Sequence, residues 1–194
     1  MIVNDLRPGV CGVLLAAGAG RRAGGPKALR RDPDGTSWLL RSIGVLLDGG
    51  CRTVVVVLGC EAEAARSIVL GSVNHPDRVR IVEAVTWRDG MGESLRAGLL
   101  AVPAGYEAVV VHLVDLPDVS SAIVRRMIRL AARTELARAT YHGRPGHPVL
   151  IGSDHCAGVV DGLAGDAGAR AYLDRHGVIG VECGDLATGR DQDW

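Results

Sequence analysis

Val10-Cys-Gly-Val-Leu-Leu-Ala16 is an apolar run that leads directly into Ala17-Gly-Ala-Gly-Arg-Arg-Ala-Gly-Gly-Pro-Lys27, a segment rich in glycine and positive charge. Two further apolar runs occupy residues 53–58 and 108–114, and weaker ones lie at 78–83, 136–141, 148–151 and 178–182. The strong runs lack polar alternation, which is typical of strands covered on both faces. Helix-length segments at 37–47, 61–70, 92–101, 120–133, 153–163 and 168–176 separate the runs. This alternation predicts an α/β fold with a mostly parallel central sheet.

Length and composition restrict the classes of protein that this chain can represent. Its 194 residues, 47% of them hydrophobic, suit a single domain spanning 1–194. The 22 basic and 22 acidic side chains balance, so we expect neither a nucleic-acid nor a membrane partner. Neither a signal peptide nor an apolar stretch of about 18 residues is apparent. The five cysteines form no C-x-x-C pair, and we expect reduced thiols in a cytoplasmic protein.

The glycine-rich segment after the first run predicts a phosphate-binding loop. Ligands of open α/β sheets bind beyond the carboxyl ends of the strands. Glycines let backbone N–H groups approach a phosphate, and Arg21, Arg22 and Lys27 add three cations within seven residues. The Walker A pattern is absent because Ala28 follows Lys27. Gly18-x-Gly20-x-x-Ala23 matches the dinucleotide fingerprint, but Gly24-Gly-Pro26 prevents the helix that should begin there. The alternative is that this segment is a solvated surface turn with ordinary basic residues and no role in binding.

The third strong run ends in His112-Leu-Val-Asp-Leu-Pro-Asp118, which places Asp115 at a strand's carboxyl end. A triphosphate is bound with Mg²⁺, which takes one or two carboxylates together with phosphate oxygens and water. We therefore predict that Asp115 is a magnesium ligand. The alternative is that Asp115 only shapes the turn before Pro117.

Leu15-Ala-Ala-Gly-x-Gly-x-Arg-x-Gly-x-Pro-Lys-Ala-Leu29 resembles the L-A-A-G-x-S-x-R-M-G-x-P-K signature of MobA-like NTP transferases, which include the molybdenum cofactor cytidylyltransferases and guanylyltransferases. The resemblance implies a three-layer Rossmann-like nucleotidyltransferase fold. It implies that Arg22, Lys27 and Asp115 are the catalytic residues, with Arg21 at a variable position. The nucleotide-binding residues that it implies are Leu15, Ala16, Ala17, Gly18, Gly20, Arg22, Lys27 and Ser94.

Further motifs extend the resemblance over residues 10–193. Asp115 lies in a segment similar to the V-D-x-P motif, in which the Asp coordinates magnesium. Residues 190–194 resemble the start of the family's D-[IV]-[DN]-T-P-E-D element, and by that match Asp193, beside Asp191, is a second metal ligand. A frayed polar tail is the alternative for Asp193. Residues 90–99 resemble a cytidylyltransferase segment that retains Ser94, and its helix would point N-terminal amides at an anion. His147 and Asp166 lie in segments similar to G-H-P-[VL] and G-D-x-G-[AV]-R, which the resemblance places over the acceptor.

The resemblance implies transfer of a nucleoside monophosphate, CMP in preference to GMP, from an NTP to a phosphorylated small molecule of the molybdopterin type. It implies Mg²⁺ as cofactor and transient contact with a molybdoenzyme or its chaperone. We expect the first loop and residues 59–62 to select the base. Two alternatives remain: an NAD(P)H-dependent oxidoreductase that uses the Gly18-x-Gly20 fingerprint, and a non-catalytic cofactor carrier on the same fold.

Overall fold

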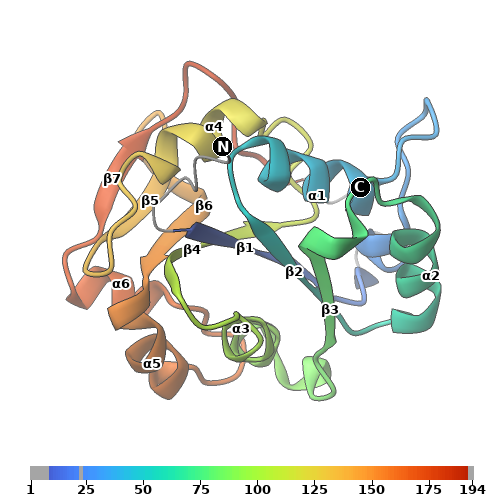
Figure 1. The fold of residues 1–194 in the computed structure, drawn as a ribbon, viewed down its shortest axis with the longest axis horizontal. Coiled ribbons are helices and arrows are strands. Elements are labelled where there is room, and N and C mark those ends of the chain that lie inside the picture. The colour runs from blue at the N-terminus through green and yellow to red at the C-terminus, as the bar shows by residue number, and fades with distance from the viewer. Residues whose placement is uncertain (1–8, 22–23, 192–194) are drawn as a thin grey trace, which may run out of the picture.

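The computed structural model describes residues 9–21 and 24–191, which form a seven-stranded sheet with strand order β3-β2-β1-β4-β6-β5-β7 (Figure 1). β6 runs antiparallel to β4 and β5, and every other neighbouring pair is parallel. The predicted α/β class with a mostly parallel sheet is confirmed. The strands are β1 (Gly9–Ala16), β2 (Thr53–Leu58), β3 (Val79–Glu83), β4 (Tyr106–Leu113), β5 (Leu136–Tyr141), β6 (Arg144–Gly152) and β7 (Ile179–Glu182).

Six α-helices of the described chain cover the two faces of the sheet and complete the three layers. One face packs against α1 (Trp38–Asp48), α2 (Ala62–Ser72) and α4 (Ser121–Ile128). The other face packs against α3 (Met91–Leu100), α5 (Ser153–Gly162) and α6 (Arg170–Arg175). Short 3-10 turns lie at Lys27–Leu29, Pro76–Arg78 and Trp87–Asp89.

The central strands have apolar residues at successive positions because they contribute to both cores. In β2, Val54 and Val56 face the α1 side while Val55 and Val57 face the α3 side, and all four are buried. Period-two alternation of side chains sends consecutive valines to opposite faces. The continuous apolar run is therefore the consequence of helices on both faces.

The β5–β6 hairpin differs most from the sequence expectation. The sequence predicted only a weak strand at residues 148–151 in this part of the chain. The structure begins β6 at Arg144, paired with Tyr141. His142 (φ 52°) and Gly143 (φ 78°) form the two-residue connection, and positive φ at both positions matches the twist of a hairpin. His147 therefore lies within a strand and not in a glycine-rich loop.

The helix expected at 120–133 is also shorter in the structure, since α4 ends at Ile128. Beyond the helix, the amides of Leu130 and Ala131 donate to Met127 O and Ile128 O in tighter turns. The chain must reverse here to enter β5 at Leu136.

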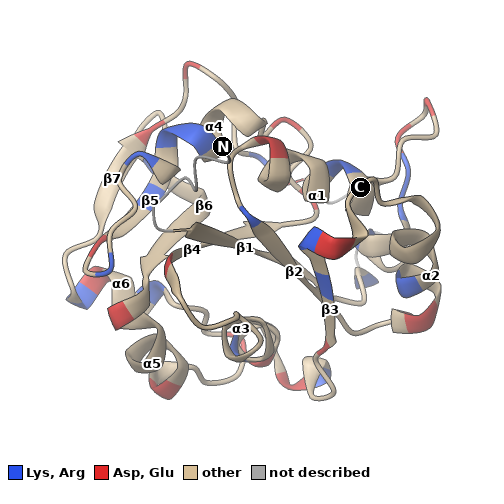
Figure 2. Cartoon of the chain, viewed as in Figure 1, with Lys and Arg blue, Asp and Glu red and all other residues tan. Residues whose placement is uncertain are grey.

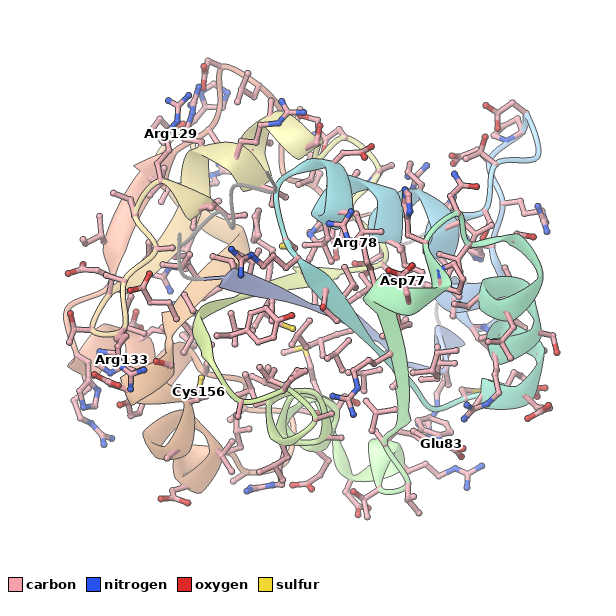
Figure 3. The ribbon with its side chains drawn as sticks, in the orientation of Figure 1. Asp77, Arg78, Glu83, Arg129, Arg133 and Cys156 are labelled. Carbon is pink, nitrogen blue, oxygen red and sulfur yellow. The ribbon has the colours of Figure 1, made fainter. Side chains whose placement is uncertain are left out.

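Basic and acidic residues are spread along the whole ribbon (Figure 2), in agreement with the balanced composition. Glu83, Arg129 and Arg133 lie at its periphery (Figure 3). Arg78 instead points toward the start of β2, where its guanidinium donates to the carbonyls of Cys51 and Arg52. All five cysteines are unpaired thiols. Within the described ranges, the structure contains no helix that is both long and apolar enough to cross a membrane.

The strand order reverses at the middle of the sheet. The chain moves from β1 to β2 and β3 on one side, and then returns to β4 on the other side of β1. The loops that follow β1 and β4 therefore diverge at the carboxyl edge, where open α/β sheets bind ligands. The predicted phosphate loop follows β1, and Asp115 follows β4.

Candidate active site

The loop after β1 is shaped by a glycine that no other residue could replace without rearrangement. Gly20 has φ +56°, and the Gly25 amide donates to the Gly20 carbonyl over 3.2 Å. A Cβ built at Gly20 would lie 2.0 Å from the Gly25 oxygen. The MobA-like signature has serine at this position, so this chain closes its loop more tightly than a serine permits.

Lys27 and Asp115 are 88 residues apart in sequence and meet at the carboxyl edge of the sheet. Lys27 Nζ lies 2.7 Å from Asp115 Oδ2, and both side chains are 16% exposed. The approach follows from the register of β1 and β4, in which Leu15 pairs with Leu113 and the Val114 amide donates to the Leu15 carbonyl. A charge-assisted hydrogen bond in such a partly enclosed place is stronger than one at the open surface.

A cavity of about 460 Å³ opens over these two residues, and we call it the nucleotide cavity. Its volume is in the range of small-molecule sites. Most of the predicted nucleotide-binding residues line it, and Arg22 and Asp193 lie outside the described residues. The predicted residues found in its wall are Leu15, Ala16, Ala17, Gly18, Gly20, Lys27, Ser94, Asp115 and Asp166.

The sequence analysis identified Arg21 only as a loop cation at a variable position, and it did not select Trp87 or Arg88. All three line the nucleotide cavity. The Arg88 guanidinium lies 4.8 Å from the Trp87 ring centroid. Residues 59–62 do not line the cavity, contrary to their expected role in base selection. Gly59 instead leaves space for Trp87, whose Cγ would lie 2.7 Å from a Cβ at Gly59. A tryptophan after a weak strand carries no pattern that could have identified it.

The amino end of α3 is less open than the sequence predicted. α3 begins at Met91, and the Gly92 amide donates to the Gly165 carbonyl over 3.0 Å. Gly90, with φ +130°, allows the close approach of residue 165. Arg96 adds a second link by donating to the Val160 and Leu163 carbonyls. The Gly92 amide is therefore used to hold the loop that carries Asp166, while Ser94 remains in the cavity wall.

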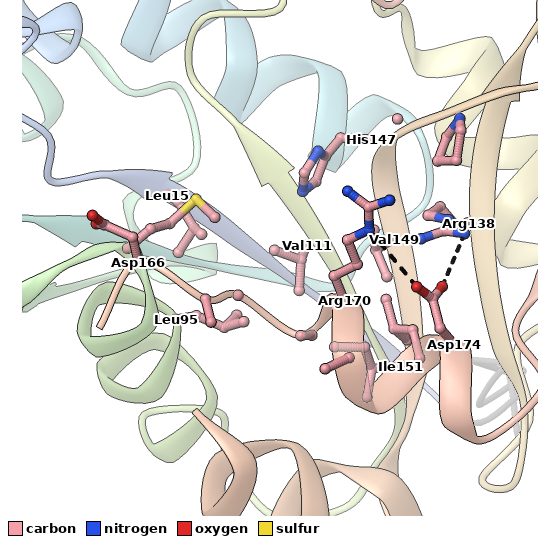
Figure 4. Close-up of a pocket in the computed structure, with 18 residues that line it drawn as sticks. Leu15, Leu95, Val111, Arg138, His147, Val149, Ile151, Asp166, Arg170 and Asp174 are labelled. Atoms are coloured by element: carbon pink, nitrogen blue, oxygen red, sulfur yellow. Dashed lines mark ion pairs between the residues drawn. The ribbon is translucent and has the colours of Figure 1, made fainter. Parts of the chain in front are cut away.

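A second cavity, of about 670 Å³, adjoins the first, and we call it the acceptor cavity. Leu15, Met91 and Asp166 line both cavities. His147, the other predicted acceptor residue, lies in its wall (Figure 4). The pKa of His147 is lowered to about 4, mainly by burial; nearby Asp115 opposes this shift and Arg138 adds to it. His147 is therefore a neutral imidazole at neutral pH.

The groups in the nucleotide cavity that could bind a metal ion are carboxylates. Within residues 9–21 and 24–191, no three His, Cys, Asp or Glu side chains are grouped as a metal cluster. Asp115 and Asp166 line one cavity, and Asp191 is exposed and lines neither. Thr188 holds the tail near β4 by donating from its amide and hydroxyl to Asp118 Oδ2. A donor set of one or two carboxylates suits Mg²⁺, which takes phosphate oxygens and water for its remaining positions.

Comparisons with known proteins agree with this geometry. A family model described as "MobA-like NTP transferase domain" matches residues 12–179. A protein of Paenarthrobacter nicotinovorans named nicotine blue oxidoreductase is 37% identical over 196 residues, covering 96% of this chain and 93% of the relative.

Solved structures share the fold. The Rv0371c protein of Mycobacterium tuberculosis H37Rv superposes with a TM-score of 0.76 at 28% identity, covering 95% of this chain and 94% of that one. The same protein in complex with manganese gives a TM-score of 0.73 at 27% identity over the same shares of the two chains. A nucleotidyl transferase of Methanothermobacter thermautotroptrophicus gives 0.76 at 21% identity, covering 90% and 87%, a likeness of fold alone.

Proposed function

The chain belongs to the MobA-like NTP transferase family, and on that premise we propose that it transfers a nucleoside monophosphate from an NTP to a phosphorylated small molecule. The observation that carries the proposal is the Lys27–Asp115 pair at 2.7 Å in a cavity that joins a second cavity. One cavity suits the nucleotide, and the other suits an acceptor placed beside it. Holding two reactants side by side supplies much of the rate enhancement of a group transfer.

In the proposed reaction, an oxygen of the acceptor's phosphate forms a bond to the α-phosphorus while the bond from the α-phosphorus to the bridging oxygen breaks. Pyrophosphate leaves with the electron pair of that bond. A phosphate monoester is mostly dianionic near neutral pH, so its attack requires no general base. Lys27 and Arg21 are the described loop cations in the cavity wall, and they would stabilise the charge that develops on the departing phosphates. We assign the same role to Arg22.

We propose Mg²⁺ as the cofactor, held by Asp115 and the nucleotide phosphates. Support comes from the carboxylates in the nucleotide cavity and from the manganese complex of the M. tuberculosis relative. When bound, the ion would neutralise charge on the phosphates and polarise the α-phosphate. Asp193 is retained as a proposed second ligand, and Asp166 is a further carboxylate in the same wall.

For the substrates, we propose CTP in preference to GTP and an acceptor of the molybdopterin type. Both follow from the residues 90–99 and 146–148 that resemble cytidylyltransferases. Trp87 offers an aromatic face to a nucleobase in the cavity. Under this proposal, a molybdoenzyme or its chaperone would receive the product.

An oxidoreductase is the second candidate function, because the relative from P. nicotinovorans carries that name at 37% identity. A two-part experiment separates the candidates. Pyrophosphate release is measured with each of the four NTPs, Mg²⁺ and molybdopterin, and melting temperature is measured with MgCTP or NADH. A transferase releases pyrophosphate with one NTP above the others and is stabilised by that nucleotide. Stabilisation by NADH alone, without pyrophosphate release, would reject the proposal in favour of the oxidoreductase.

A further inference from the structure

The acceptor cavity has an apolar floor. Leu95, Val111, Val149, Ile151 and Leu173 line it, and each is at most 5% exposed. All five belong to the core between the sheet and helices α3, α5 and α6. Such a floor provides no hydrogen-bond partner for the hydroxyl groups of a polyol, whose desolvation would then be uncompensated. A flat ring can cover this surface without losing hydrogen bonds.

One end of the acceptor cavity carries excess positive charge. Arg138 Nη2 lies 3.3 Å from Asp174 Oδ1, and Arg170 Nε lies 3.7 Å from Asp174 Oδ2 (Figure 4). Two guanidinium groups thus share one carboxylate. Arg138 Nε is also buried without a hydrogen-bond partner among the described residues. His147 is neutral and therefore adds no further positive charge to this end.

The two ends of the cavity differ in chemistry. Asp166 lies at the opposite end from Arg138, Arg170 and Asp174, with the apolar side chains between them (Figure 4). The Asp166 end is the one that joins the nucleotide cavity, since Asp166 lines both. A molecule that lies along the cavity would therefore place its far end against the arginines and its near end toward the nucleotide.

We propose that this cavity binds a flat, largely apolar aromatic ring that carries an anionic group, with the anion against Arg138 and Arg170. If the proposed transferase function holds, the ring is the far part of the acceptor, and the acceptor's reacting phosphate is a separate group at the Asp166 end beside the nucleotide cavity. Binding of the ring itself does not depend on that function. Planar recognition of an oxyanion by guanidinium groups provides the orientation. Contact of the ring with the aliphatic floor provides most of the affinity.

Binding of 2-naphthoate to the whole chain, measured by calorimetry without nucleotide, tests the proposal. We expect saturable binding and no binding of glycerol 3-phosphate, a polyol phosphate. Ala171 is exposed and lines the cavity, so Ala171→Trp should fill the cavity and weaken binding about tenfold or more. Arg175→Trp places the same ring on the same helix outside this cavity, and it should bind 2-naphthoate as the unmodified chain does.

The charged end is tested with two variants, Arg138→Met and Arg170→Met. The Arg170 side chain is 84% exposed, so its replacement should not impair folding. Each should weaken 2-naphthoate about tenfold and leave the neutral 2-naphthalenemethanol unaffected, because only the anion uses the guanidinium. Arg144→Met, an exposed change outside the cavity, is the control. Absence of saturable binding, equal binding of glycerol 3-phosphate, or indifference to Ala171→Trp would overturn the proposal. Retained 2-naphthoate binding without pyrophosphate release from any NTP supports the cavity assignment and rejects only the transferase.

Discussion

Replacing Asp115 by Asn tests the centre of the proposed site. The substitution keeps the size of the side chain and its suitability for a turn, so the fold should survive. It removes the carboxylate that Lys27 contacts at 2.7 Å, where both side chains are 16% exposed. Hydrogen bonds to charged groups contribute about 1.5–3 kcal/mol, so we expect the free energy of unfolding to fall by roughly 1–3 kcal/mol. Turnover should fall at least about 100-fold, since a neutral amide is a poor ligand for a hard dication.

The assay is pyrophosphate release against Mg²⁺ concentration, with chemical unfolding measured on the same samples. Asp118→Asn is a matched control, because Asp118 lies in the same turn but accepts hydrogen bonds from Thr188 and does not line the nucleotide cavity. Its Mg²⁺ dependence should equal that of the unmodified chain. Superimposable Mg²⁺ curves for Asp115→Asn and the unmodified chain would refute the metal assignment, whatever the change in stability.

Three further predictions concern the loop and the core. Lys27→Ala should lower turnover about 100-fold. Arg21→Ala should lower it as well, though less, because Arg21 also lines the nucleotide cavity; unchanged turnover in both would remove the loop from the site. Gly20→Ala should weaken nucleotide binding, measured by calorimetry, and destabilise the chain by at least about 1 kcal/mol, because its Cβ would meet the Gly25 oxygen at a positive φ. Burial lowers the pKa of His112 from 6.5 to about 3, so the folded state binds fewer protons and stability is lost as the pH falls below 6.5. From pH 7 to pH 4 this loss should be roughly 3 kcal/mol by urea unfolding, and His112→Leu should remove it; an unaltered pH profile in that variant would contradict the assignment.

Much of the fold was predictable because it depends on local patterns. The apolar runs at β1, β2 and β4 and the helix-length segments between them identified the α/β class, since strands covered on both faces have no polar alternation. The β5–β6 hairpin was not predictable in the same way. Its prolines argue against a strand locally, and only pairing across the His142-Gly143 turn offsets that preference.

Some residues of the candidate site could also be placed from the sequence, whereas others are brought together only by the fold. Lys27 and Asp115 each follow a strong strand, so sequence reasoning could place both at the carboxyl edge of the sheet. Arg138 comes from β5, which has no recognisable ligand motif, and Asp174 lies in α6 beyond the G-D-x-G-[AV]-R segment that ends at Arg170. Their encounter depends on strand order and on helix packing, which connect residues distant in the chain.

The sequence by itself determined the class of fold, the glycine-rich loop and the presence of Lys27 and Asp115 after strong strands, because each is encoded in a short stretch of residues. Only the tertiary structure decided that Lys27 and Asp115 lie 2.7 Å apart, that Gly165 holds the amino end of α3, and that an apolar cavity with a cationic end adjoins the nucleotide cavity. The physical reason is that these features arise from strand register and from the packing of helices on one face of the sheet. Those interactions join segments that are separated by tens of residues, and no local pattern specifies their geometry.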